Sequence, residues 1–131
     1  MALPFIKLVR DVPVTIALPA AASTSVNTAA VDIGVNGVPI ECVFEVPALN
    51  ATILPDTRTM TSAVEVSNVA NFASFDTIAT AVQTGAGGIG AAAISKRAVI
   101  PPVYQYVRLK VTSGVSTTTA AAFTGSFAIV P

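Results

Sequence analysis

The sequence predicts an all-β fold: a single-domain antiparallel β-sandwich, in the form of a jelly roll of about eight strands. Three observations lead to this prediction. Apolar residues recur with a period of two rather than 3.6 along most of the 131 residues. Turn-forming Gly, Pro, Asn and Asp residues separate these runs. No linker or internal repeat divides the chain, so we expect residues 1–131 to form one domain.

The first predicted strand covers residues 12–18, where valine, isoleucine and leucine alternate with smaller or polar residues. Residues 1–12 precede it and are also rich in apolar side chains. They are interpreted either as an arm that reaches a neighbouring molecule or as an edge strand of the domain's own sheet.

A β-hairpin is predicted over residues 31–46, because Asn36-Gly37 is the favoured pair for a two-residue type I′ turn. The expected register pairs apolar residues on one side, so turn chemistry and burial agree. These pairs are Val35 with Val38, Ile33 with Ile40, and Val31 with Cys42.

The same register places Asp32 opposite Glu41 on the outer side of the hairpin. Like charges in that position are destabilising unless something offsets them. A basic side chain such as Arg108 or Lys110, simple solvation, a bound cation or a neighbouring subunit would each do so. A catalytic carboxylate pair, as in glycosidases, is the remaining interpretation of the two acids. The absence of an aromatic cluster in the sequence argues against a sugar-binding cleft beside this pair.

Further strands are predicted at residues 59–69, 103–112 and 123–129, each with clear alternation. In the second of these, Val103, Val107, Leu109 and Val111 are expected to share one face. Residues 71–84 fit either a helical stripe or a strand, and their β-branched residues favour a strand.

Few residues suggest catalysis or ligand binding. The chain contains no histidine, which excludes His-based triads and the usual zinc sites. Residues 85–90 match G-x-G-x-x-G, yet no acidic residue follows Asp76 and Pro101-Pro102 comes too soon for a crossover helix, so a glycine loop is the better interpretation. Cys42 is the only cysteine and is expected to be a buried, inert thiol. We therefore predict no catalytic, cofactor-binding or metal-binding residue and no enzymatic activity.

Charged residues make up only 11% of the sequence, against about 25% in ordinary soluble domains. Much of the surface must then carry Ala, Val, Thr and Ser, which is typical of a subunit that contacts partners. Residues 1–76 hold seven acids and three bases, whereas residues 77–131 hold four bases and no acid. Four cations are too few for a nucleic-acid interface. No run approaches the roughly 20 apolar residues of a membrane span, and Asp11 and Pro13 interrupt the start of the chain where a signal peptide would need an apolar run.

With this composition, the pair of terminal segments 102–114 and 122–130 resembles the jelly-roll cement (capsid decoration) proteins of short-tailed phages, such as that of a Bordetella phage. The resemblance implies a homodimer or higher homo-oligomer that is made in the host cytoplasm and sits on the phage head surface. There it would bridge copies of the major capsid protein as a non-enzymatic virion component. The alternative is a secreted or cell-surface β-sandwich binding or adhesion module, which would require cleavage near Ala22.

Overall fold

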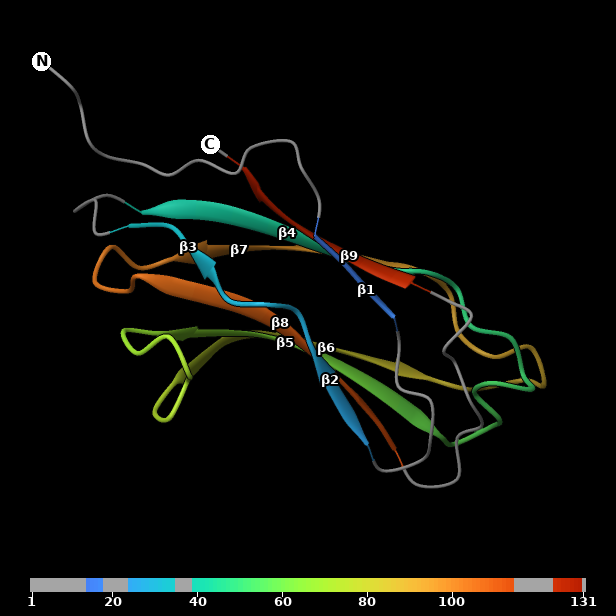
Figure 1. The fold of residues 1–131 in the computed structure, drawn as a ribbon. Coiled ribbons are helices and arrows are strands. Elements are labelled where there is room, and N and C mark those ends of the chain that lie inside the picture. The colour runs from blue at the N-terminus through green and yellow to red at the C-terminus, as the bar shows by residue number, and fades with distance from the viewer. Residues whose placement is uncertain (1–13, 18–23, 35–38, 115–123, 131) are drawn as a thin grey trace, which may run out of the picture.

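The computed structural model describes residues 14–17, 24–34, 39–114 and 124–130, and within these ranges every regular element is a strand. These described ranges contain nine strands (Figure 1). They are β1 (Val14–Ala17), β2 (Ser25–Asn27), β3 (Val31–Asp32), β4 (Ile40–Val46), β5 (Thr59–Ser67), β6 (Asp76–Thr84), β7 (Ile94–Ile100), β8 (Tyr106–Ser113) and β9 (Thr124–Val130).

The strands form two stacked antiparallel sheets (Figure 1). Sheet A has the order β1-β9-β4-β7, and sheet B has the order β2-β8-β5-β6 with β3 also paired to β8. Since β2 and β3 both pair with β8, at Val26–Val111 and Val31–Val107, they fill one strand position. Strands from the two ends of the chain pair successively toward its middle. The pairs, from the outermost inward in sequence, are β1–β9, β2/β3–β8, β4–β7 and β5–β6. This is the jelly-roll arrangement, and the predicted all-β sandwich is confirmed.

The core lies between the two sheets and is built by the alternation seen in the sequence. In β4, Ile40, Cys42, Phe44 and Val46 are buried, while Glu45 faces solvent. The rings of Phe44 and Phe127 are fully buried at directly opposed positions of β4 and β9. Val64 and Leu109 occupy the corresponding inner face of sheet B, so both sheets contribute to one cluster.

The predicted hairpin register is wrong. Val31 pairs with Val107 of β8 in sheet B, whereas Cys42 pairs with Ala98 and Ile129 in sheet A. The two runs therefore lie in different sheets, because the chain crosses the sandwich between them. Alternation specifies which face of a strand is buried but not which strand is its partner. The Asn36-Gly37 turn lies outside the described residues, as do residues 1–12.

Other boundaries also differ from expectation. Residues 76–84 form a strand, as favoured, but residues 71–75 belong to the preceding loop. Strand β8 begins at Tyr106, and Val103 is 64% exposed rather than on the inner face. Strands β2 and β7 were not predicted, since β2 has three residues and β7 carries adjacent Lys96 and Arg97 on an edge.

Candidate interaction surface

The loop between β5 and β6, residues 68–75, folds back against the outer face of sheet B at one end of the sandwich (Figure 1). Its Phe72 is only 5% exposed, and the guanidinium carbon of Arg108 lies 4.2 Å from the centre of the Phe72 ring. Arg108 belongs to the outer face because its neighbours Val107 and Leu109 point into the core. The loop is thus a packed structure rather than a bare connection.

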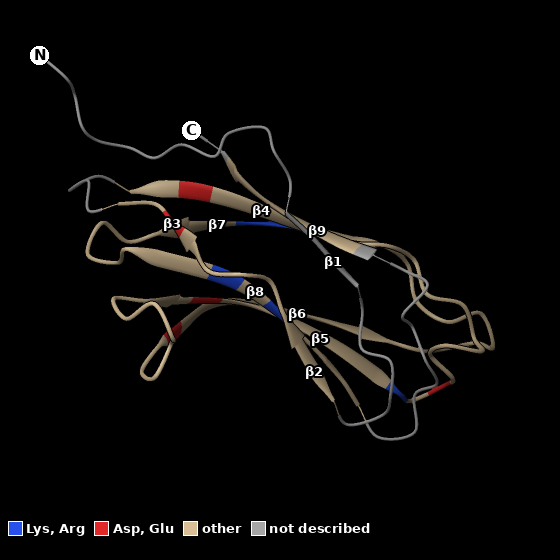
Figure 2. Cartoon of the chain, in the orientation of Figure 1, with Lys and Arg blue, Asp and Glu red and all other residues tan. Residues whose placement is uncertain are grey.

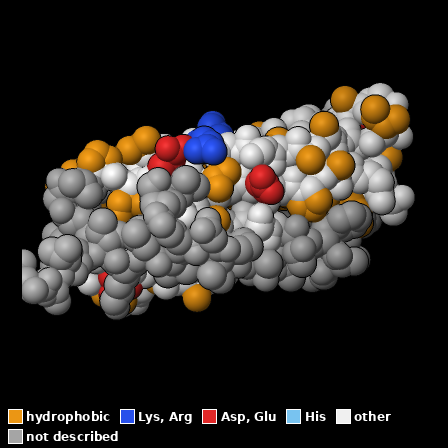
Figure 3. Space-filling model, turned by 90° about the horizontal axis from the view of Figure 1, so that it is seen from above, with side chains coloured by type: hydrophobic (Ala, Val, Ile, Leu, Met, Phe, Trp, Pro, Cys, Tyr) orange, Lys and Arg blue, Asp and Glu red, His pale blue; other side chains and the backbone are white. Residues whose placement is uncertain are grey.

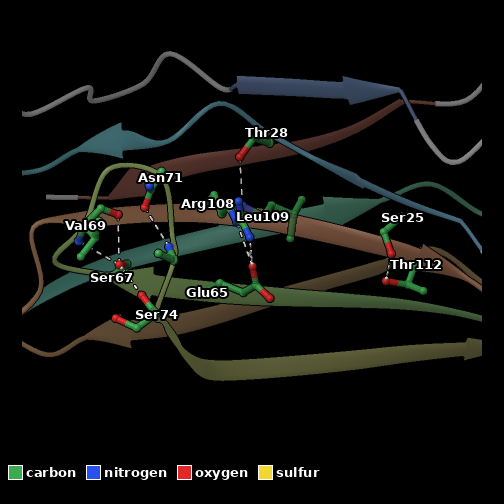
Figure 4. Close-up of polar contacts among 11 residues, drawn as sticks. Ser25, Thr28, Glu65, Ser67, Val69, Asn71, Ser74, Arg108, Leu109 and Thr112 are labelled. Carbon is green, nitrogen blue, oxygen red and sulfur yellow. Dashed lines mark hydrogen bonds and ion pairs between the residues drawn. The ribbon is translucent and has the colours of Figure 1, made fainter.

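Beneath this loop lies a buried ion pair between Arg108 and Glu65 (Figure 4). The Nε and Nη2 atoms of Arg108 both lie 2.8 Å from Oε1 of Glu65. The exposed fractions of the two side chains are 17% for Arg108 and 4% for Glu65. A charge removed from water to this degree requires a close partner. The pair therefore fixes the guanidinium plane on which Phe72 packs.

Ser67 closes the loop on itself (Figure 4). Its Oγ lies 2.6 Å from the Ser74 carbonyl oxygen and 3.1 Å from that of Val69, and it accepts the Val69 N–H at 2.9 Å. Within the loop, Asn71 Oδ1 accepts the N–H of Ala73 at 2.9 Å. Phe72 adopts a left-handed backbone with φ of 54°, which is unfavourable for an aromatic residue and is tolerated here because burial of its ring holds it.

The segment between β7 and β8 joins this loop through two polar contacts. The Tyr104 hydroxyl donates to Oδ2 of Asp76, and the Gln105 N–H donates to Oδ1 of Asn68 at 3.1 Å. The hydrogen bond to the Asp76 carboxylate raises the pKa of Tyr104 above its ordinary value of 10.0, because it stabilises the protonated phenol. Two loops that are about 30 residues apart in sequence are thereby held together.

Between the two loops lies an open hollow of about 370 Å³. Its lining consists of Val66, Ser67, Asn68, Ser74, Phe75, Asp76, Val103 and Tyr104. Exposed apolar side chains stand in this loop region: Val69, Phe75 and Val103 are 41%, 45% and 64% exposed. We call the two loops together with Asp76 at the start of β6, residues 68–76 and 101–105, the loop surface.

Sequence reasoning missed the loop surface because its aromatic residues come from separate segments. Phe72 and Phe75 precede β6, whereas Tyr104 precedes β8, and no run of the sequence shows them as a cluster. Their proximity depends on the jelly-roll pairing of β5 with both β6 and β8. The i, i+3 spacing of the two phenylalanines in a Ser/Asn-rich stretch is the one available signal, and that spacing also fits a helical stripe.

The structure separates the two carboxylates that the sequence placed opposite one another. Glu41 accepts a hydrogen bond from Nη1 of Arg97 at 2.5 Å, on the outer face of sheet A. Asp32 lies in sheet B, where its Oδ1 accepts the Gly34 N–H at 2.9 Å. The bases considered as partners lie elsewhere: Arg108 binds Glu65, and Lys110 lies on β8 opposite Asn27 and Ala63. The expected like-charge pair does not exist.

Among the described residues, the charged side chains on the outer face of sheet A are Arg97, Glu41 and Glu45, and Val99 on the same face is 60% exposed. Figure 2 shows how thinly charges are spread over both sheets, and Figure 3 shows basic and acidic side chains as small islands among uncharged and apolar atoms. The Arg97 and Glu41 side chains remain 65% and 38% exposed. A hollow of about 390 Å³ borders Glu45, Ile94 and Ser126 on this sheet, but its lining contains no aromatic side chain.

The remaining candidates from the sequence have structural roles. The 85–90 loop connects β6 of sheet B to β7 of sheet A, and the Gly88 N–H donates to Oδ1 of Asp56, an acid of this chain. Gly85 and Gly90 lie so close to backbone oxygens of residues 49 and 54–55 that a side chain would clash there. Cys42 is fully buried, and burial raises the pKa of its thiol from 9.0 to about 12.

Within the described residues, no group of three or more cysteine, aspartate or glutamate side chains converges as a metal site would require. No helix that is long and apolar enough to cross a membrane occurs among them.

No protein-family model and no curated protein matches this chain. Solved structures similar to it include the K1 cleaved adhesin domain of Lys-gingipain from Porphyromonas gingivalis W83, with 20% identity, a TM-score of 0.48, and coverage of 80% of this chain and 59% of that one. The CBM22-1–GH10 modules of xylanase 10B from Clostridium thermocellum, complexed with xylohexaose, show 13% identity, a TM-score of 0.42, and coverage of 86% and 20%. Infectious bursal disease virus strain Gx shows 12% identity, a TM-score of 0.44, and coverage of 90% and 30%. This chain thus spans less than two thirds of each, and such low similarity says nothing about its ligands or partners.

Proposed function

We propose that this chain is a non-enzymatic structural subunit of a virion, a capsid cement protein that docks through its loop surface. The observation that carries the proposal is the group of exposed apolar side chains Val69, Phe75 and Val103 on loops that are packed and hydrogen-bonded. A preorganised apolar surface is suited to binding, because little ordering of side chains or backbone remains to be done on association.

The low charge content of the chain supports the same proposal. Sheet faces with few charged side chains and a loop surface with exposed apolar side chains favour permanent burial against other subunits over free existence in water. Contacts of modest strength, repeated by many copies on one shell, reinforce one another through multivalency. The bound partner is then the major capsid protein, with further copies of this chain beside it.

The first experiment measures the mass of the full chain by light scattering over a concentration series, and then its co-sedimentation with capsid shells of the virus that encodes it. We expect a dimer or larger species that pellets with the shells. Phe75→Ser should weaken pelleting by about tenfold, because truncating a central aromatic contact typically costs more than 1 kcal/mol.

The matched control is Ile89→Ser, since Ile89 is 81% exposed but lies beyond the other end of β6. That variant should pellet like the unmodified chain. A chain that stays monomeric at high concentration and remains in the supernatant with shells would contradict the proposal and favour the adhesion module.

A further inference from the structure

The hollow of the loop surface is lined by an acid, Asp76, that in the described part of the chain has a hydrogen-bond donor at only one of its two carboxylate oxygens. Asp76 is exposed, and its Oδ2 accepts the Tyr104 hydroxyl. Among the described residues, no donor contacts its Oδ1. The nearby guanidinium of Arg108 is committed to Glu65 at 2.8 Å. The hollow therefore presents negative charge beside the exposed ring of Phe75.

Three other oxygen atoms of the lining are already engaged. Asn68 Oδ1 accepts the Gln105 N–H, the Ser67 hydroxyl binds Ser74 O and Val69 O, and the Tyr104 hydroxyl is used by Asp76. A neutral sugar needs several free donors and acceptors in addition to an aromatic platform. A ligand that only donates hydrogen bonds and carries positive charge fits the remaining carboxylate oxygen better.

Beside the hollow, the protein already holds one guanidinium group between a carboxylate and an aromatic ring. Arg108 lies 2.8 Å from the Glu65 carboxylate, 4.2 Å from the Phe72 ring centre and 5.8 Å from the Phe75 ring centre. The hollow pairs a second acid, Asp76, with Phe75, whose ring centre lies farther from Arg108 than that of Phe72, and within the described residues no cation contacts Asp76. A guanidinium suits such a place better than an ammonium, since it is planar, weakly hydrated and stacks on rings.

We propose that the hollow binds the guanidinium group of an arginine side chain presented by the partner protein. This inference rests on the docking role proposed for the loop surface and names the chemistry of the partner's contact. The apolar side chains of Val103 and Phe75 then enclose the aliphatic part of the arginine, while its donors meet the Asp76 carboxylate.

The test uses the full chain and N-acetyl-arginine methylamide as the probe, followed by NMR of the Phe75 and Tyr104 ring signals. Titration extends to about 100 mM, because an isolated side-chain ligand binds in the millimolar range. We expect saturable shifts, and binding weaker by about tenfold or more for the neutral isostere N-acetyl-citrulline methylamide. Asp76→Asn should lose the arginine response, while Glu45→Gln, an exposed acid on sheet A, should keep it.

Absence of saturation in the unmodified chain, equal binding of the citrulline probe, or an undiminished response in Asp76→Asn would each overturn the inference. So would stronger binding of a neutral oligosaccharide at the same ring signals. Shell co-sedimentation separates the two proposals. If shells bind Asp76→Asn as well as the unmodified chain, the docking surface stands and the arginine contact falls. If the probe binds but shells do not, the pocket stands and the cement function falls.

Discussion

Arg108 and Arg97 both bind a glutamate across neighbouring strands, but their surroundings differ. The Arg108–Glu65 pair lies under Phe72, with 17% and 4% of the side chains exposed, whereas Arg97–Glu41 has 65% and 38% exposed. Water screens the second pair and does not reach most of the first. The same chemical pair is therefore a structural anchor in sheet B and a minor contact in sheet A.

We expect Arg108→Ala to lower the free energy of unfolding by about 2–4 kcal/mol, because Glu65 would be left buried without its cation. Arg97→Ala, the matched control, should change it by less than about 1 kcal/mol. Urea unfolding followed by far-UV circular dichroism measures both. Equal losses in the two variants would show that burial does not distinguish the pairs.

Cys42 gives the chain a dependence on alkaline pH. Burial raises the pKa of the thiol from 9.0 to about 12, so above pH 9 the unfolded chain loses a proton that the folded chain keeps. Stability from this group is complete below pH 9 and falls by about 1.4 kcal/mol per pH unit between 9 and 12. In Cys42→Ala this part of the slope should be missing, which urea unfolding at a series of pH values will reveal. Parallel curves for the two proteins would contradict the assigned burial of the thiol.

At the scale of elements, the sandwich has a side at which β6 and β7 are the terminal strands of their sheets. Lys96 is at an inward position of β7, opposite Phe44 of β4, yet its Nζ reaches the Thr80 carbonyl oxygen of β6 at 2.6 Å. An inward-placed charge on an edge strand opposes pairing with another chain. The lysine thus places a charge between β6 and β7, the two strands whose outer edges lack a partner among the described strands on this side of the sandwich.

Replacement of this lysine should open the edge. We expect Lys96→Val to increase concentration-dependent association, while the free energy of unfolding changes by less than about 1 kcal/mol. Lys110→Val is the control, since it removes the same charge from β8, which lies between other strands. Light scattering over a concentration series measures the association of both variants. Equal association of the two would mean that the loss of charge, and not the exposed edge, causes association.

The alternation of apolar and polar residues was sufficient to predict most strands, but it did not predict correctly which strands pair. β4 reads as a strand because Ile40, Cys42 and Phe44 alternate with more exposed residues, and it is one. Its predicted partner was the run around Val31, which instead joins β8. The partner depends on which sheet the chain enters after residue 34, and no local property of these residues encodes that choice. The loop surface was missed for the same reason, since its two loops meet only through the pairing of β5 with β6 and β8.

For the whole molecule, composition and periodicity were sufficient to predict a β-sandwich, because a two-residue period leaves each strand one face to bury. The wrapping of the two sheets joins their inner faces into one core containing Phe44, Val64, Leu109 and Phe127. A single core shared by both sheets implies that they unfold together rather than one at a time.

We expect Phe127→Ala to lower the free energy of unfolding by about 3–5 kcal/mol, because a fully buried ring at the centre of sheet A is replaced by a cavity. The transition should remain single, with circular dichroism and tyrosine fluorescence changing together, although both tyrosines lie on the sheet B side. Separate transitions for the two signals would mean that the sheets are independent.

The position of β9 between β1 and β4 also determines when sheet A can be completed during folding. The ribosome makes β1 and β4 before residues 124–130 leave the exit tunnel, so neither strand can meet this neighbour until then. Sheet A is therefore completed only after β9 has been made, and a chain still waiting for this strand leaves the edges that β1 and β4 turn toward it unpaired. A newly made chain acquires a complete sheet A only when β9 inserts between strands that were made before it.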